Sequence, residues 1–105
     1  MARTGYKISE KSVVNNILKY ANKHNNCFLY KYHGGRFATN GFPDLFGAID
    51  GKFVAIECKS PSGRLTILQK QTLDALKAKG AITGIARSID DFKNVLEKHQ
   101  LELTA

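Results

Sequence analysis

The sequence has no long hydrophobic run, because none of its apolar stretches approaches the roughly 18 residues that a membrane span needs. Residues 1–7 contain no apolar segment after their basic residues, so we expect no secretory signal peptide. Only two cysteines are present, Cys27 and Cys58, and both lie within apolar stretches. This placement favours buried free thiols in a reducing compartment over a disulfide framework, and it predicts a cytoplasmic protein.

Acidic residues are also scarce. Nine Asp and Glu stand against sixteen Lys and Arg, which gives a net charge of +7 and a pI near 9.6. A small globular protein with this excess most often binds a polyanion. Two alternatives stay open: a solvated lysine-rich surface, and binding to an acidic membrane surface. The second needs a basic amphipathic helix with a free apolar face, whereas the basic residues here are spread along the whole chain.

Repeats, linkers and low-complexity tracts are absent, and hydrophobic (43%) and charged (24%) residues occur at globular frequencies. Disordered and fibrous classes are therefore excluded, and the length predicts a single domain over residues 1–105. Apolar periodicity and turn signals predict elements in the order αβββαβα. They are a helix over 9–25, strands over 27–32, 45–49 and 52–59, a helix over 67–79, a strand over 81–87 and a helix that begins after Ser88. Residues 101–105 receive no assignment.

These elements predict an α/β fold with a central mixed sheet. The dipeptide Asp50-Gly51 is a strong hairpin signal, so the two strands beside it are expected to be antiparallel. The strand after the 67–79 helix follows a crossover and is expected to run parallel to a neighbour. Both faces of the hairpin are apolar, which predicts that helices cover both of them. One face carries Phe46, Ala48, Phe53 and Ala55, and the other carries Leu45, Ile49, Val54, Ile56 and Cys58.

A two-residue turn at Asp50-Gly51 places Asp44 directly opposite Glu57, with Lys59 on the same face. At about 4 Å and an effective dielectric near 20, two like charges repel by about 4 kcal/mol. Lys59 offsets part of this repulsion, and a divalent cation would offset more, since one or two carboxylates with open positions suit Mg²⁺. Two less specific arrangements stay open. In one, the three groups form a solvated surface ion cluster without a function. In the other, a one-residue shift of the strand register puts Asp44 on the opposite face.

The residues around this hairpin resemble a known motif. They are Gly41-Phe42-Pro43-Asp44, then Ile56-Glu57-Cys58-Lys59, then Ser60-Pro61-Ser62-Gly63-Arg64-Leu65-Thr66 and Gln69. Together they resemble the PD-(D/E)xK nuclease superfamily, and their spacing is similar to its virus-type replication-repair nuclease (VRR-NUC) family. The likeness extends from Glu10 to about Asp91. It implies a restriction-endonuclease-like αβββαβ core, which agrees with the order of elements predicted above.

The resemblance implies roles for the residues of the motif. Asp44, Glu57 and the main-chain carbonyl of Cys58 would bind a metal ion, Mg²⁺ or Mn²⁺. Lys59 would position or help to deprotonate the attacking water and would stabilise the developing negative charge. The chain would be the nuclease module alone, with no added DNA-binding domain.

Two further positions match the family, and each also has a simpler structural role. Gln69 fits the glutamine of the following helix, near the waters of the metal, but its spacing from Thr66 also completes a capping box. Glu10 fits an acidic residue of the first helix that reaches the same ion, but an acid there also favours the helix dipole. Arg36 and Arg64 lie in loops beside the site, where they bind the DNA backbone or are solvated surface. Metal-ligand spacing is lacking around His24, His33 and His99.

The predicted function is a Mg²⁺- or Mn²⁺-dependent DNA endonuclease that hydrolyses phosphodiester bonds. Symmetric cutting of two strands needs two sites and therefore a dimer. Stand-alone members of the family resemble Holliday-junction resolvases, which implies a junction-cutting homodimer in a bacterial or phage-infected host cell. Two alternatives stay open: a monomeric flap or restriction-type nuclease, and a basic nucleic-acid-binding module without catalysis.

Overall fold

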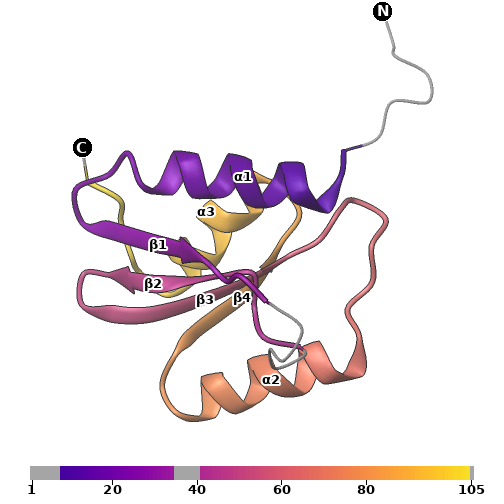
Figure 1. The fold of residues 1–105 in the computed structure, drawn as a ribbon. Helices are drawn as coiled ribbons and strands as arrows, with labels where there is room; N and C mark the ends of the chain where they lie inside the picture. The colour runs from indigo at the N-terminus through magenta and orange to yellow at the C-terminus, as the bar shows by residue number, and fades with distance from the viewer. Residues whose placement is uncertain (1–7, 35–40, 105) are drawn as a thin grey trace, which may run out of the picture.

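A computed structural model describes residues 8–34 and 41–104 and contains the elements in the predicted order (Figure 1). They are α1 (Glu10–Ala21), β1 (Cys27–Lys31), β2 (Leu45–Ile49), β3 (Lys52–Cys58), α2 (Ile67–Ala78), β4 (Ile82–Ala86) and α3 (Ile89–Lys98). Each helix begins after a hydroxyl side chain that accepts a hydrogen bond from the first turn, which satisfies a backbone donor that has no partner within the helix. These N-caps are Ser9, Thr66 and Ser88.

The four strands form one mixed sheet in the order β1-β2-β3-β4. β2 pairs with β1 and with β3 in antiparallel fashion, whereas β3 and β4 are parallel. The predicted hairpin register is confirmed, because Ile49 pairs with Lys52 and the pairing continues to Leu45 and Ile56. Asp50 and Gly51 both have positive φ values, 52° and 78°, which is the combination that a two-residue turn between twisted strands requires.

Helices α1 and α3 cover one face of the sheet, and α2 lies on the other (Figure 1). The hydrophobic core lies between the sheet and the α1/α3 layer. Fully buried members include Ile17 of α1, Leu45 of β2, Ile56 of β3 and Phe92 of α3. Both cysteines are free, and the buried side chain of Cys58 belongs to this core.

The opposite face is covered by α2 only in part, so the expectation that helices cover both faces is confirmed for only part of this side. Helix α2 packs on β3 and β4 and leaves the outer part of the sheet open. Phe28 and Tyr30 of β1 are 66% and 54% exposed, and Phe53 of β3 is 43% exposed. The physical reason is that one short helix spans two strands of a four-stranded sheet. We call the residues Phe28, Tyr30, Phe46, Ala48 and Phe53 the aromatic sheet face.

The ends of the elements differ slightly from the predicted ranges. Helix α1 ends at Ala21 rather than near residue 25, because the side chain of Asn22 bonds both the amide and the carbonyl of Leu29, each at 2.8 Å. Residues 101–104, which had no assignment, pack back onto the molecule. Leu101 is buried, and the Thr104 amide donates a hydrogen bond to Asn26 Oδ1 at 2.8 Å. Among the described helices, none has the length and apolar character to cross a bilayer.

Candidate active site

The hairpin register brings Asp44 and Glu57 together, as predicted. Asp44 lies one residue before β2, and its carbonyl accepts a hydrogen bond from the Tyr32 amide at 2.8 Å. One oxygen of its carboxylate, Oδ2, accepts a hydrogen bond from the Cys58 amide at 2.9 Å. Glu57 is the next-to-last residue of β3 and is only 1% exposed. The Asp44 carboxylate is therefore held against the end of β3, beside the Glu57 side chain.

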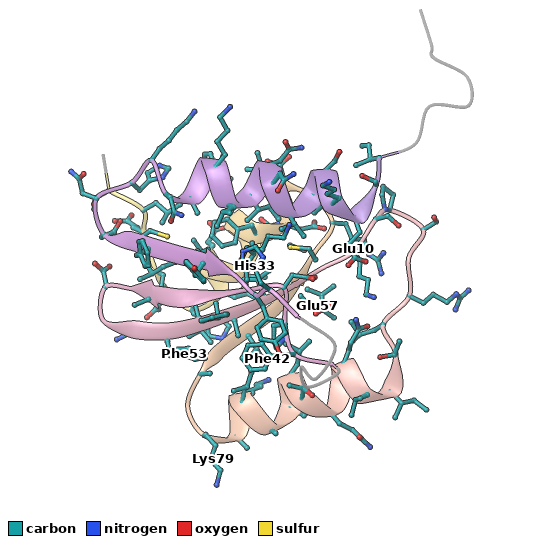
Figure 2. All side chains as sticks on the ribbon, viewed as in Figure 1. Glu10, His33, Phe42, Phe53, Glu57 and Lys79 are labelled. Atoms are coloured by element: carbon teal, nitrogen blue, oxygen red, sulfur yellow. The ribbon has the colours of Figure 1, made fainter. Side chains whose placement is uncertain are left out.

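A third carboxylate reaches the same place from the first helix. Glu10 is the first residue of α1, and its side chain lies near Glu57 (Figure 2). One oxygen from each of Glu10, Asp44 and Glu57 lies within 4.8 Å of the others. The three carboxylates come from α1, from the loop before β2 and from β3. The fold thus brings together carboxylates that lie up to 47 positions apart in the sequence.

Lys59 supplies positive charge to this cluster. Its ammonium nitrogen lies 3.8 Å from Glu10 Oε1 and 3.8 Å from Glu57 Oε2, although the residue is only 6% exposed. Burying a charged lysine is costly unless it is paired. The two carboxylates provide that pairing, so Lys59 is held at the cluster with little freedom to turn away.

Gln69 completes the predicted capping box and also contacts the carboxylate cluster. Its amide N–H donates to Thr66 Oγ1 at 3.1 Å, and its side-chain oxygen accepts from the Thr66 amide at 2.9 Å, which completes the capping box. Its remaining side-chain donor, Nε2, bonds Glu57 Oε2 at 2.9 Å. The residue therefore completes the cap at the start of helix α2 and orients the Glu57 carboxyl at the same time.

The electrostatics of the cluster follow from burial and like charge. Burial, followed by the negative charge of Asp44, raises the pKa of Glu57 to about 8, although Lys59 acts in the opposite direction. Burial and Asp44 also raise the pKa of Glu10, against the same lysine. One lysine thus leaves the three carboxylates incompletely neutralised.

The donor set fits a hard divalent cation. Three carboxylates offer the oxygen ligands that Mg²⁺ and Mn²⁺ prefer, and an ion among them would supply the missing positive charge. The thiol of Cys58 points into the core, so only its carbonyl is available as a ligand, as the family resemblance implies. In the described part of the chain, no other group of three His, Cys, Asp or Glu residues is close enough together to hold an ion.

We expect the metal-free protein to lose stability as the pH rises from about 5 to about 8. In this range the folded state keeps a proton on Glu57, whose pKa is raised to about 8, while an unfolded glutamate near pKa 4.5 has lost it. The unfolded state binds fewer protons, so the free energy of unfolding falls with pH, by at most about 1.4 kcal/mol per unit. Urea unfolding in a chelating buffer at several pH values measures this slope.

The matched control for this slope is Glu57→Gln, which keeps the shape and removes the titration. Its curve should be flatter than that of the wild type between the same pH values. Added Mg²⁺ should stabilise the wild type more at pH 8 than at pH 6, because the ion binds the ionised carboxylate. Equal slopes in wild type and variant would mean that Glu57 is ionised throughout.

The remaining predicted site residues are more dispersed. Arg64 is exposed in the segment between Lys59 and α2. Arg36 lies outside the described residues. The histidines take no part in the cluster: His24 and His99 bond backbone carbonyls of their own turns, and His33 is exposed beside the Tyr30 ring.

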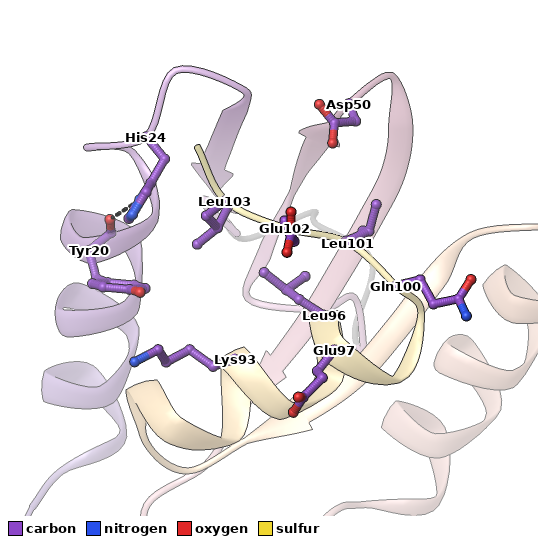
Figure 3. Close-up of a pocket in the computed structure, with 10 residues that line it drawn as sticks. All are labelled: Tyr20, His24, Asp50, Lys93, Leu96, Glu97, Gln100, Leu101, Glu102 and Leu103. Carbon is purple, nitrogen blue, oxygen red and sulfur yellow. Dashed lines mark hydrogen bonds between the residues drawn. The ribbon is translucent and has the colours of Figure 1, made fainter. Parts of the chain in front are cut away.

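The broad hollow in Figure 3 lies away from the carboxylates. It is formed by the end of α1, the β2–β3 turn, α3 and the chain after α3, with Tyr20, Asp50 and Lys93 among its lining residues. The β2–β3 turn is at the opposite end of the hairpin from Glu57. The hollow mixes apolar side chains with charges of both signs, and no described residue lining it belongs to a metal-ligand cluster. We therefore place the candidate site at the carboxylates.

One residue beside the site was missed by sequence reasoning. Arg87, directly after β4, donates hydrogen bonds from Nη1 to the carbonyls of Ser60 and Gly63, each at 2.7 Å. These carbonyls belong to the loop that follows Lys59. Local sequence signals could not reveal the contact, because the partners lie 24 and 27 positions earlier in the chain.

Comparison with known proteins finds no matching family model and no matching curated protein. Solved structures do match. One, described as "VRR_NUC domain protein", superposes with a TM-score of 0.71 over 95% of this chain and 95% of its own, at 19% sequence identity. At this identity the likeness concerns the fold, and it extends over nearly the whole of both chains. The chain therefore has the fold of a VRR-NUC domain, the nuclease family that its hairpin motif resembles.

Proposed function

We propose that the protein is a DNA endonuclease that uses Mg²⁺ or Mn²⁺ to hydrolyse phosphodiester bonds. The observation that carries this proposal is the cluster of Glu10, Asp44 and Glu57, whose carboxylate oxygens lie within 4.8 Å of one another beside the ammonium of Lys59. A protein that only binds DNA has no need for an acidic cluster at its DNA-binding surface, because carboxylates repel the phosphate backbone. The VRR-NUC fold supports the same conclusion.

The residues divide the chemical work as follows. Glu10, Asp44 and Glu57 would hold the ion, which when bound lowers the pKa of water and neutralises negative charge on a phosphate. Gln69 keeps the Glu57 carboxyl oriented through its hydrogen bond to Oε2. Lys59 places its ammonium where negative charge develops on the phosphate, in a buried position where such a charge acts strongly.

The basic surface supports DNA as the substrate. A net charge of +7 on 105 residues gives affinity for the phosphate backbone through counterion release, without reference to sequence. Arg64 is exposed between the catalytic lysine and α2, and we propose that it binds the backbone near the site, together with Arg36, which lies outside the described residues. A cytoplasmic location agrees with the two free, buried cysteines.

The direct test is cleavage of four-way, flap and linear DNA, each with Mg²⁺ and with chelator. We expect cleavage with Mg²⁺, none with chelator, and preference for the four-way junction. Cleavage of flap or linear DNA alone would support the monomeric flap or restriction-type alternative. DNA binding without cleavage under any metal condition would identify a non-catalytic binding module and contradict the proposal.

We further propose that the active form is a homodimer that resolves Holliday junctions, with the aromatic sheet face as the contact between copies. Two strands cut symmetrically require two sites, and each chain provides one. The aromatic sheet face carries no charged side chain, so two chains with a charge of +7 each can meet there without placing lysines against each other. Exposed Phe and Tyr residues are typical of the centres of such interfaces.

Light scattering of the wild type in dilute salt should therefore give about twice the monomer mass of 11.6 kDa. Phe28→Lys should give the monomer mass, because it places a charge within the contact, where it would be desolvated. Phe28 is 66% exposed in the single chain, so the substitution leaves the core intact.

Ile67→Lys is the matched control for this experiment, because Ile67 is 79% exposed but lies on α2, outside the aromatic sheet face. Its mass should equal that of the wild type. A wild-type monomer, or a Phe28→Lys variant that stays dimeric, would contradict the proposed interface.

A further inference from the structure

We propose that Arg87 is a positioning residue, which holds the loop after the catalytic lysine against the Lys59 side chain and so fixes its ammonium at the carboxylates. The inference rests on the proposed nuclease function for its catalytic consequence. Its structural basis is independent of that function, since it consists of the hydrogen bonds from Arg87 to the 60–63 loop and the closeness of Gly63 to the Lys59 side chain.

The first step is the place of Arg87 in the sheet. The Lys59 amide donates to the Ala86 carbonyl at 3.0 Å, which extends the parallel ladder of β3 and β4 by one residue beyond Cys58. Arg87 is thus the first residue after the end of this ladder, and it follows the strand that pairs with the segment of Lys59. Its own amide is held by Asp91 Oδ2 at 2.9 Å, so its backbone is tied to the first turn of α3.

The second step is what the guanidinium does. A terminal guanidinium nitrogen has two N–H donors, and Nη1 of Arg87 uses them on the carbonyls of Ser60 and Gly63, each at 2.7 Å. The Pro61 carbonyl is a weaker third partner at 3.4 Å. The same Ser60 carbonyl accepts from the Gly63 amide at 3.0 Å. The loop is therefore drawn into a closed turn around one arginine nitrogen.

The third step links this turn to Lys59. A Cβ built at Gly63 would lie 3.5 Å from Lys59 Cδ and 3.0 Å from Ser60 Oγ, so the Gly63 backbone passes close to the methylenes of the lysine. Lys59 is only 6% exposed, and its ammonium is 3.8 Å from two carboxylates. The loop thus forms part of the cover that keeps the side chain in this orientation. Without Arg87 we expect the turn to open and the lysine to gain other orientations.

The kinetic test is a double-mutant cycle in single-turnover cleavage at saturating Mg²⁺. Arg87→Ala should lower the rate constant of cleavage by roughly tenfold to a hundredfold, the scale of a small misplacement of a catalytic group, with the apparent affinity for DNA little changed. In a Lys59→Ala background, Arg87→Ala should lower the rate constant of cleavage by less than about threefold, because the side chain that Arg87 positions is absent. Additive losses would overturn the proposal.

Lys52→Ala serves as the matched control for the lost positive charge, since Lys52 is exposed at the other end of β3. It should change salt-dependent binding and leave the rate constant near that of the wild type. If Arg87→Ala does not fold by circular dichroism, Arg87→Lys takes its place in the cycle. That variant keeps the charge but has a shorter side chain without the guanidinium whose Nη1 reaches both carbonyls, so a smaller loss with the same dependence on Lys59 is expected.

A second readout does not depend on cleavage. Hydrogen exchange of the Gly63 amide in the metal-free protein should be at least about tenfold faster in Arg87→Ala, because the turn that protects it is released. The methylene groups of Lys59 should also become more mobile by ¹³C relaxation. Unchanged exchange and unchanged mobility would overturn the proposal. A wild type that cuts no DNA would contradict the proposed function, while this measurement would still decide whether Arg87 holds the loop.

Discussion

Asp44→Asn should abolish detectable cleavage, by roughly three orders of magnitude or more, while DNA binding stays at least as strong as in the wild type. Stabilisation of charge by a bound metal contributes several kcal/mol, and each ~1.4 kcal/mol is a factor of about ten in rate. The variant should fold, because the asparagine side-chain oxygen can still accept the hydrogen bond from the Cys58 amide. Single-turnover cleavage and fluorescence anisotropy with chelator measure the two quantities separately.

The hairpin itself offers the control for this experiment. Asp50→Asn makes the same chemical change in the turn at the other end of the two strands, where Asp50 has a φ of 52°. Asparagine is well tolerated in this conformation and in this type of turn. Cleavage should therefore stay close to that of the wild type. An Asp44→Asn protein that still cuts DNA with Mg²⁺ would show that Asp44 is not needed to hold the ion.

Lys59→Ala should slow the chemical step by about two to four orders of magnitude, the range for losing one group that acts on the transition state. Two features of the structure set this expectation. The ammonium lies at the carboxylates of Glu10 and Glu57, and the residue is 6% exposed, so water cannot screen its charge efficiently. The rate is to be measured at saturating Mg²⁺, so that a change in ion affinity does not contribute.

Lys59→Met separates charge from packing, since methionine keeps most of the apolar volume of the lysine stem. The Lys59→Met protein should cleave DNA as slowly as Lys59→Ala, but it should be more stable to urea than that variant. Lys52→Met, at the exposed start of β3, provides the comparison for the loss of one charge. A Lys59→Met enzyme within a factor of about ten of the wild-type rate would make this lysine a structural counter-ion rather than a catalytic group.

Much of the site could be predicted because it depends on local geometry. The Asp50-Gly51 turn allows one favourable register, and this register alone places Asp44 against Glu57. The capping box between Thr66 and Gln69 likewise determines where α2 begins. The mixed topology followed from the length of the connection between β3 and β4, which is long enough for a crossover helix.

The rest depends on contacts between distant segments, which periodicity does not encode. Helix α2 covers only β3 and β4, so the apolar residues Phe28 and Phe53 stay exposed on a face that was expected to be covered. The hydrogen bonds of Arg87 to the 60–63 loop depend on the side-by-side position of β3 and β4 beyond the last ladder pair. Neither feature has a signature in a stretch of neighbouring residues.

The proposed activity requires that the carboxylates of Glu10, Asp44 and Glu57 bind one hard divalent ion together. The most direct measurement is the anomalous difference density of crystals grown with Mn²⁺. We predict a peak between the three carboxylates, about 2.1 Å from their nearest oxygens, a typical distance for such ions. Crystals that show no peak at this place under saturating Mn²⁺, or that hold Mn²⁺ only elsewhere, would show that the three carboxylates do not form a metal site.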